Sequence, residues 1–330
     1  MNYNRLGKTD IKVSEIGFGA WAIALNWWGK EIQEDEAERM LKKAYDVGIN
    51  FFETGDMYGK GKSEKIIGRV FKDMRDEVVI STKYGYDFEG VEQIGHSELP
   101  QRFDPEFTKK ALKNSLDRLQ TDHLDMYGLH NPKIHHIRDD KIFDILDGFI
   151  ADGKISTYQV ALGPAIGWTQ EGLEAMGKKN ISAVQTVYNI LEQTPGNELL
   201  GNALENEVGI LVRVPEASGV LTGKVNAKTK INENDHRAVR KREWIISALE
   251  KVEQLVPIAD RNGLNMTELA IKFILSKKGF ASVFPTMVEE EEISRYAEMA
   301  DGRYIPASDM AEIESIYNTW PAYELKATAK

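Results

Sequence analysis

The chain contains no cysteine among its 330 residues. Disulfide bonds, thiolate metal sites and cysteine nucleophiles are therefore excluded, and the composition indicates a reducing compartment. The chain also lacks any run of about 18 consecutive apolar residues, the length that a transmembrane helix needs. Its first ten residues, MNYNRLGKTD, are polar and carry no apolar segment of a signal peptide. We therefore expect a cytoplasmic protein that does not interact with membranes.

Positive charge is scarce as well. The 42 lysines and arginines are outnumbered by 52 aspartates and glutamates, which gives a formal net charge of −10. Such a protein repels a polyphosphate backbone, and no stripe of basic residues interleaved with aromatics counteracts the repulsion, so we expect no nucleic-acid partner. We also expect no metal, because the spacing of His130, His135 and His136 with Asp139 and Asp140 fits no common ligand set.

What the chain does contain is a repeated alternation of short β-branched runs and longer amphipathic stretches. The length and the 42% hydrophobic content allow a large core. No linker or low-complexity tract divides the chain, so we treat residues 1–330 as one domain. The expected strands are residues 16–20, 49–53, 78–83, 124–130, 155–161, 183–189, 209–215 and 281–285. The expected helices between them include residues 35–47, 63–71, 105–119, 137–151 and 197–207.

This order of elements predicts a (β/α)8 barrel, because alternating strands and helices form parallel sheets and eight such units favour closure. Residues 3–16 are expected to form a hairpin around residues 7–10 that covers the bottom of the barrel. Residues 224–241 are rich in charge and asparagine, which indicates a long exposed loop. Residues 244–262 are expected to form an additional helix.

Four polar residues coincide with the ends of successive predicted strands. Glu53 ends the second strand, Tyr58 follows it in the loop, Lys83 ends the third strand and His130 ends the fourth. Reactive groups of such barrels lie at the carboxyl ends of the strands, so these four are expected to meet. Lys83 would favour ionisation of the Tyr58 phenol, a carboxylate at position 53 would hold Lys83, and His130 would donate a hydrogen bond to a carbonyl oxygen.

Each of these residues has a simpler interpretation when it is taken alone. Tyr58 could be an ordinary loop aromatic, Lys83 a solvated strand end, and Glu53 with Lys83 a structural ion pair. The combination is more informative than its members, because an acid, a phenol, an ammonium and an imidazole at neighbouring strand ends suit proton transfer to a carbonyl oxygen.

The segment FFETGDMYG at residues 51–59 resembles the signature of the aldo/keto reductase superfamily, in which a strand ends in Asp-Thr-Ala and a tyrosine follows five residues after the acid. Further similarities keep the family order along nearly the whole chain: RLG at residues 5–7, GFGAW at 17–21, STK at 81–83, LDMY at 124–127 leading to His130, and GVLTGK at 219–224 after Pro215. The resemblance implies a soluble reductase that transfers a hydride between NAD(P)(H) and an aldehyde or ketone.

The resemblance also implies roles for single residues. It makes Tyr58 the general acid, Lys83 its charged partner and His130 the residue that orients the carbonyl. Gln185 matches the glutamine that holds the nicotinamide carboxamide, and Arg213 stands where many members stack an aromatic ring on the nicotinamide. The full expected cofactor-binding set is Gly19, Ala20, Trp21, Gln185, Arg213, Pro215, Gly219, Leu221, Pro285 and Thr286. Possible walls of the substrate pocket are Trp27, Trp28, Trp168 and Tyr188.

Three parts of the chain depart from the family pattern. Glu53 replaces an aspartate, which moves the carboxylate by roughly an ångström, a shift that can matter in a preorganised site. Ala161 and Leu162 stand where the family has serine and asparagine, so two groups that grip the carboxamide are missing.

The third departure concerns the phosphate-binding stretch of the family. Here Pro285 and Thr286 are followed by Met-Val and then by Glu289, Glu290, Glu291 and Glu292, and Tyr296 replaces an asparagine that holds adenine. Carboxylates repel a 2′-phosphate, so an NADH preference is one expectation. The other interpretation is that the glutamates form the dipole-favoured first turn of a helix.

Two alternatives to a reductase follow from these departures. A chain that keeps the fold and binds a nicotinamide without efficient turnover would be a regulatory subunit. A chain that keeps only the Tyr58 and Lys83 proton chemistry would be a lyase or an isomerase. A small-molecule carbonyl or alcohol remains the expected substrate class.

Overall fold

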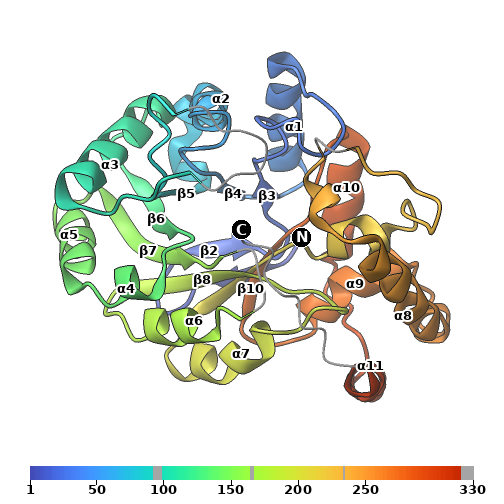
Figure 1. Cartoon of the computed structure of the whole chain (residues 1–330). Coiled ribbons are helices and arrows are strands. Elements are labelled where there is room, and N and C mark those ends of the chain that lie inside the picture. Colours follow the sequence, from blue (N-terminus) through green and yellow to red (C-terminus); the bar gives the residue numbers. More distant parts are fainter. Residues whose placement is uncertain (92–98, 164–166, 233–234, 321–330) are drawn as a thin grey trace.

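The computed structural model describes residues 1–91, 99–163, 167–232 and 235–320. Within these residues, eight parallel strands form one sheet in which each strand pairs with its neighbours in chain order, and the helices surround it (Figure 1). The strands are β3 (Phe18–Gly19), β4 (Phe51–Glu53), β5 (Val79–Tyr84), β6 (Leu124–His130), β7 (Ile155–Ala161), β8 (Ile181–Val187), β9 (Gly209–Arg213) and β10 (Phe280–Phe284).

The two edges of this sheet meet just before β3. Ile16 forms a parallel bridge with Val283 of β10, and the amide of Gly17 donates to the Val283 carbonyl at 2.9 Å. The sheet is thus a nearly closed barrel, and the expected (β/α)8 fold is confirmed. The barrel strands are buried along almost their whole length, because side chains fill one face and helices cover the other.

The helices around the barrel begin at the residues that the capping rules favour. Asp104 accepts from the Phe107 amide at 3.0 Å immediately before Pro105, the first residue of α3. Asn265 and Glu268 form a reciprocal capping box at the start of α9. The α-helices are α1 (Glu34–Asp46), α2 (Lys62–Phe71), α3 (Pro105–Leu119), α4 (Ile134–Ile137), α5 (Asp140–Ala151), α6 (Thr169–Met176), α7 (Gly196–Glu205), α8 (Arg242–Arg261), α9 (Met266–Leu275), α10 (Glu290–Met299) and α11 (Ala307–Thr319). Short 3-10 helices are η1 (Lys72–Glu77), η2 (Ala217–Thr222) and η3 (His236–Val239).

One predicted helix is divided in the structure. The pattern predicted a single helix over residues 137–151, but α4 ends at Ile137 and α5 begins at Asp140. Asp139 separates them because its carboxylate accepts from the Lys141 amide at 3.1 Å, as an N-cap residue does. The predicted strand at residues 183–189 is shifted, since β8 begins and ends two residues earlier.

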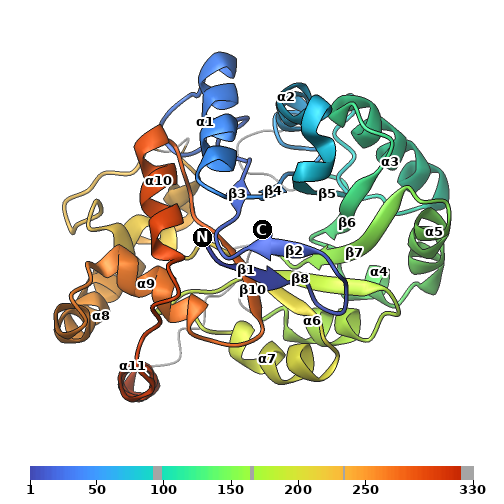
Figure 2. The same ribbon diagram turned by 180° about the vertical axis from the view of Figure 1, so that it is seen from behind.

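The first residues form the expected hairpin, in which β1 (Tyr3–Arg5) pairs with β2 (Lys12–Ser14) in antiparallel register. The side-chain amide of Asn4 donates to the Ala281 carbonyl at 3.1 Å, at the amino end of β10. The hairpin therefore lies across the amino-terminal end of the barrel, as Figure 2 shows from behind. The opposite end, where the strands finish, stays available for a site.

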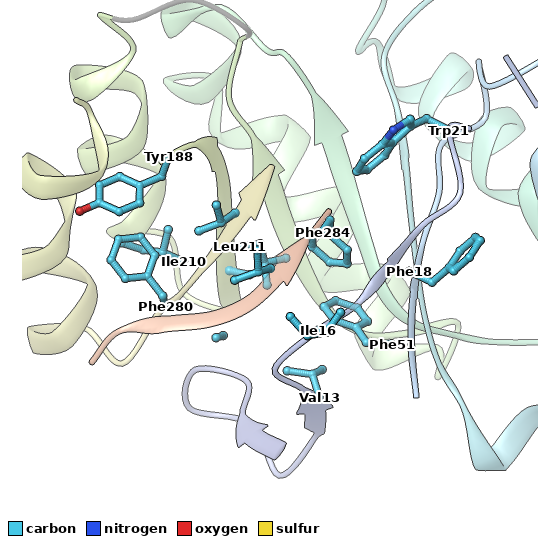
Figure 3. Packing of buried hydrophobic residues seen from close by; sticks show 14 of the residues in the cluster. Val13, Ile16, Phe18, Trp21, Phe51, Tyr188, Ile210, Leu211, Phe280 and Phe284 are labelled. Carbon is cyan, nitrogen blue, oxygen red and sulfur yellow. The ribbon is translucent and has the colours of Figure 1, made fainter. Parts of the chain in front are cut away.

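The barrel interior is filled by large apolar side chains. The Phe51 and Phe284 rings have centroids 5.2 Å apart, joining β4 to β10 across the seam (Figure 3). In the expected long exposed loop at residues 224–241, the described residues include η3 and the buried Val225 and Asp235, and the His236 amide donates to the Trp27 carbonyl at 2.7 Å. In the described part of the chain, we find no helix long and apolar enough to cross a membrane.

Candidate active site

An ion pair lies at the carboxyl ends of β4 and β5. The Lys83 ammonium donates to the Glu53 carboxylate and, at 2.8 Å, to the Thr54 carbonyl. Both side chains are fully enclosed. The register Glu53↔Ser81 and the hydrogen bond from the Ala20 amide to the Glu53 carbonyl fix this strand end between its neighbours. The longer side chain at position 53 thus reaches Lys83 directly.

Tyr58 and His130 lie beside this ion pair. The Lys83 nitrogen is 4.7 Å from the centre of the Tyr58 ring, and the Tyr58 and His130 rings meet edge to face with centroids 5.8 Å apart. Gly55 lies beside both side chains, since a Cβ there would be in van der Waals contact with Lys83 and Tyr58 at 3.4 to 3.5 Å. The structure therefore brings together the four residues that the strand ends predicted.

Burial controls the protonation of two of these groups. It raises the pKa of the Tyr58 phenol well above its usual value, and the Glu53 carboxylate adds to this effect. Burial lowers the pKa of the His130 imidazole well below its usual value. At neutral pH, Tyr58 holds its proton and His130 is uncharged. Arg213 opposes this upward shift, and the effect of Lys83 on the Tyr58 pKa stays a prediction.

Arg213 ends β9 and places a guanidinium at the mouth of the barrel. It donates to the Leu162 carbonyl, and its charge acts on Tyr58, Glu53 and Tyr86. Its Nε atom is buried without a hydrogen-bond partner, and no carboxylate of the described residues forms an ion pair with it. The next residue, Val214, has φ of 58°, a conformation that costs energy for a β-branched residue and is typical of functional sites.

Several other buried polar atoms at this end of the barrel lack a partner within the described ranges. They include donors on Trp21 and Gln185 and an acceptor on Asn131. Buried polar groups are normally paired, so unpaired donors and acceptors at a strand-end mouth indicate a ligand that supplies both. A carboxamide offers one acceptor and one donor group, and the nicotinamide of NAD(P)(H) therefore fits the residues that are present.

The other expected cofactor-binding residues lie on loops that follow β3, β9 and β10. Gly19 is required beneath the Trp21 indole, because a Cβ there would come within 2.2 Å of the ring. Gly219 has φ of 90°, which a turn after β9 demands. Ala20, Pro215, Leu221, Pro285 and Thr286 share these loops and are buried or partly buried.

The expected pocket residues separate into two groups. Trp27 and Trp28 lie near the mouth, where the Trp27 ring stacks on His236 with centroids 5.7 Å apart and Trp28 contacts Trp21. Trp168 precedes α6, and the Lys133 ammonium lies 5.1 Å from its ring centre.

Tyr188 does not belong with the expected pocket walls. Its buried ring packs beside Phe280 (Figure 3) and stacks on Phe273 of α9, and its hydroxyl donates to Asn197 at 2.8 Å. These contacts direct Tyr188 into the helix layer, so its assignment to the pocket was wrong. The residue follows β8, where the period-2 pattern no longer defines which way a side chain points.

The sequence analysis missed two residues beside His130. The Tyr86 and His130 rings meet edge to face with centroids 5.1 Å apart. The side-chain amide of Asn131 donates to the Tyr86 hydroxyl at 2.8 Å. Tyr86 comes two residues after β5 and Asn131 directly after β6, and these positions alone could have identified both as candidates.

Glu216 was missed as well. It follows Pro215 in a loop that the resemblance already assigned to cofactor binding, and it is buried. A carboxylate inside an otherwise apolar run was the signal that could have identified it.

The four glutamates at residues 289–292 have different environments. Glu289 pairs with Lys30 at 2.9 Å, Glu290 pairs with Arg39 at 3.1 Å, and Glu291 is exposed. Only Glu292 is buried, and with Glu289 it forms a capping box at the start of α10. Three of the four therefore form the solvated first turn of a helix.

Among the described residues, no group of three or more histidines, aspartates or glutamates is placed to hold a metal ion.

Residues 15–318 match the model of the aldo/keto reductase family, and the chain belongs to this family. It is an oxidoreductase that transfers a hydride between a nicotinamide cofactor and an aldehyde or ketone. The fold is similar to that of the aldo-keto reductase AKR11C1 from Bacillus halodurans, with a TM-score of 0.81 at 24% identity over 98% of this chain and 99% of that one.

Relatives match the chain over nearly its full length. The oxidoreductase YqkF of Bacillus subtilis is 25% identical, covering 96% of each chain. The NADH-specific methylglyoxal reductase of Escherichia coli is 26% identical, covering 93% of this chain and 97% of its own. A probable voltage-gated potassium channel subunit beta of Arabidopsis thaliana is 28% identical, covering 91% and 92%. The family match and the oxidoreductase relatives favour a reductase over the regulatory-subunit and the lyase or isomerase alternatives.

Proposed function

We propose that Tyr58 is the proton donor for reduction of a small aldehyde or ketone. The observation that carries this proposal is the position of a partly buried phenol that packs against both Lys83 and His130. In carbonyl reduction, Tyr58 gives its phenolic proton to the substrate oxygen as negative charge develops there. His130 is uncharged, so it orients the carbonyl through a neutral N–H hydrogen bond and does not compete as the acid.

Glu53 and Lys83 position the donor in this proposal. The ammonium is held by the Glu53 carboxylate and the Thr54 carbonyl, so its place beside the Tyr58 ring is determined by two hydrogen bonds. When the phenol loses its proton, the Lys83 ammonium beside its ring and the Arg213 guanidinium both favour the new phenolate.

A bound nicotinamide dinucleotide supplies the hydride for reduction and accepts it in alcohol oxidation. Gln185 and Trp21 would hold it through their unpaired donors, and Arg213 through the planar face of its guanidinium. The loops with Gly19, Ala20, Pro215, Gly219, Leu221, Pro285 and Thr286 would enclose the rest of the dinucleotide.

We further propose that the preferred cofactor is NADH and that the protein works in the cytoplasm. The family stretch for the 2′-phosphate carries carboxylates here, and one relative is named NADH-specific. The complete lack of cysteine supports a reducing compartment.

Tyr58→Phe tests the proposed proton donor. We expect it to remove nearly all reduction of a generic aldehyde, while NADH affinity measured by fluorescence titration stays within about twofold, because the hydroxyl acts on the substrate. Tyr3→Phe, in the hairpin at the opposite end of the barrel, is the matched control and should keep most of the rate. A Tyr58→Phe variant that retained a substantial part of the wild-type rate would exclude Tyr58 as the proton donor.

A further inference from the structure

A buried carboxylate joins the two loops that follow the last two barrel strands. Glu216 lies in the loop after β9, and its Oε1 atom accepts from the Thr286 amide at 3.0 Å and from the Tyr296 hydroxyl at 2.8 Å. Thr286 belongs to the loop after β10, and Tyr296 lies on α10. Only 4% of Glu216 is exposed, so the position of its charge is fixed by these two donors.

A second carboxylate occupies neighbouring donors of the same loop. Glu292 accepts from the Val288 amide at 2.9 Å and from the Glu289 amide at 3.3 Å, and Lys224 donates to it at 2.7 Å. In (β/α)8 barrels, the loops after strands 7 and 8 and the following helix start often bind phosphate through such amides. Here β9 and β10 are strands 7 and 8, and three of the amides that could bind phosphate already donate to protein carboxylates.

We propose that Glu216 determines which nicotinamide dinucleotide the protein accepts, selecting NADH and rejecting NADPH. This inference rests on the proposed use of a nicotinamide at this barrel mouth. A carboxylate accepts hydrogen bonds from ribose hydroxyls, whereas it repels a phosphate dianion and leaves the Thr286 amide unable to bind one.

Glu216 is a better candidate than the glutamates at the surface. Glu289 and Glu290 are neutralised by Lys30 and Arg39 from outside the loop, and Glu292 is paired with Lys224. No cation of the described residues forms an ion pair with Glu216, so its charge is compensated only by neutral donors. The discrimination between NADH and NADPH is therefore expected to depend on the Glu216 carboxylate.

The preference for NADH over NADPH should also depend on pH, because Glu216 can gain a proton. Burial raises its pKa to about 7, although the hydrogen bonds from Tyr296 and Thr286 act in the opposite direction. The titratable groups that face it are Tyr296 and Glu292, both on α10, and Glu292 carries its partner Lys224. Because the carboxylate becomes fully ionised only above neutral pH, rejection of NADPH should strengthen between pH 6 and pH 8.

The experiment measures dissociation constants of NADH and NADPH by fluorescence titration at pH 6 and pH 8. We expect the wild-type ratio of the NADPH constant to the NADH constant to rise with pH. In Glu216→Gln this ratio should fall by about tenfold at pH 8 and lose its pH dependence, because the like-charge repulsion is gone. Glu291→Gln removes a glutamate charge from an exposed position in the first turn of α10 and should keep both the ratio and its pH dependence.

A Glu216→Gln variant that folds, as judged by its thermal midpoint, and keeps the wild-type ratio at pH 8 would overturn the proposal. Tyr296→Phe provides an independent variant, since it removes one donor and leaves the carboxylate. It should still reject NADPH at pH 8, and loss of that rejection would also overturn the proposal. A wild-type protein that binds NADPH more tightly than NADH would instead contradict the proposed NADH preference, and one that binds neither would contradict the proposed nicotinamide site.

Discussion

The buried carboxylates in the two halves of the barrel mouth have different partners. At the ends of β4 to β6, the Glu53 carboxylate is paired directly with the Lys83 ammonium. After β9 and β10, the Glu216 carboxylate is held only by a hydroxyl and an amide. Glu53 thus has an opposite charge beside it, whereas burial raises the pKa of the Glu216 carboxyl to about 7. The first half is therefore suited to a constant geometry, and the second half can change its charge.

Lys83→Met is expected to have the largest effect, because it leaves the buried Glu53 carboxylate without its opposite charge. We expect activity on a generic aldehyde to be abolished and the free energy of unfolding to fall by about 3–5 kcal/mol. Urea unfolding and steady-state kinetics check these two effects. The double variant Glu53→Gln with Lys83→Met should recover most of the stability and none of the activity. If the double variant were no more stable than Lys83→Met, the buried charge would not be the cause.

Glu53→Asp tests how strongly activity depends on the length of the acidic side chain that pairs with Lys83. Aspartate restores the family residue but withdraws the carboxylate from Lys83, so the ammonium loses one of its two acceptors beside Tyr58. We expect kcat to fall by about one to two orders of magnitude with cofactor affinity unchanged. Glu53→Gln, which keeps the length and removes the charge, is the matched control and should also lose activity. An aspartate variant faster than the wild type would mean that the native glutamate strains the site.

The stability of the folded protein should depend on pH through Glu216, in the half of the barrel mouth that follows β9 and β10. The folded-state pKa of Glu216 is raised from 4.5 to about 7, so between these values the folded protein binds more protons than the unfolded chain. The resulting stabilisation is present below pH 4.5 and is lost as the pH rises through 7, a change of about 3 kcal/mol at most. Glu216→Gln should remove this decline, and urea unfolding of both proteins at pH 5 and pH 8 measures it. Equal declines in the two proteins would assign the effect to another group.

The sequence predicted the barrel and the paired half of its mouth well. Each of Glu53, Lys83 and His130 ends or nearly ends a strand whose apolar run is visible locally, and parallel strands bring their carboxyl ends together in chain order. Because the β6 and β7 boundaries agree with the predicted ones, the side chains there could be placed without knowledge of distant contacts.

The other half could not be placed in the same way. Residue 216 meets residues 286 and 296 because β9 pairs with β10, although these positions are at least 70 residues apart along the chain and α8 and α9 lie between them. The four glutamates form one acidic run in the sequence, and only the structure shows Lys30, Arg39 and Lys224 beside three of them. Tyr188 was misplaced for the same reason, since Phe273 and Phe280 are far along the chain.

The sequence by itself determined the periodicity of the strands, the family, and which residue types stand at the strand ends, because these depend on neighbours within a few positions. Only the tertiary structure decided that Lys83 is paired with Glu53, that Arg213 also acts on Tyr58, and that Glu216 occupies an amide that phosphate could otherwise bind. Those outcomes depend on burial and on contacts between segments tens to hundreds of residues apart, and a local pattern carries no information about either.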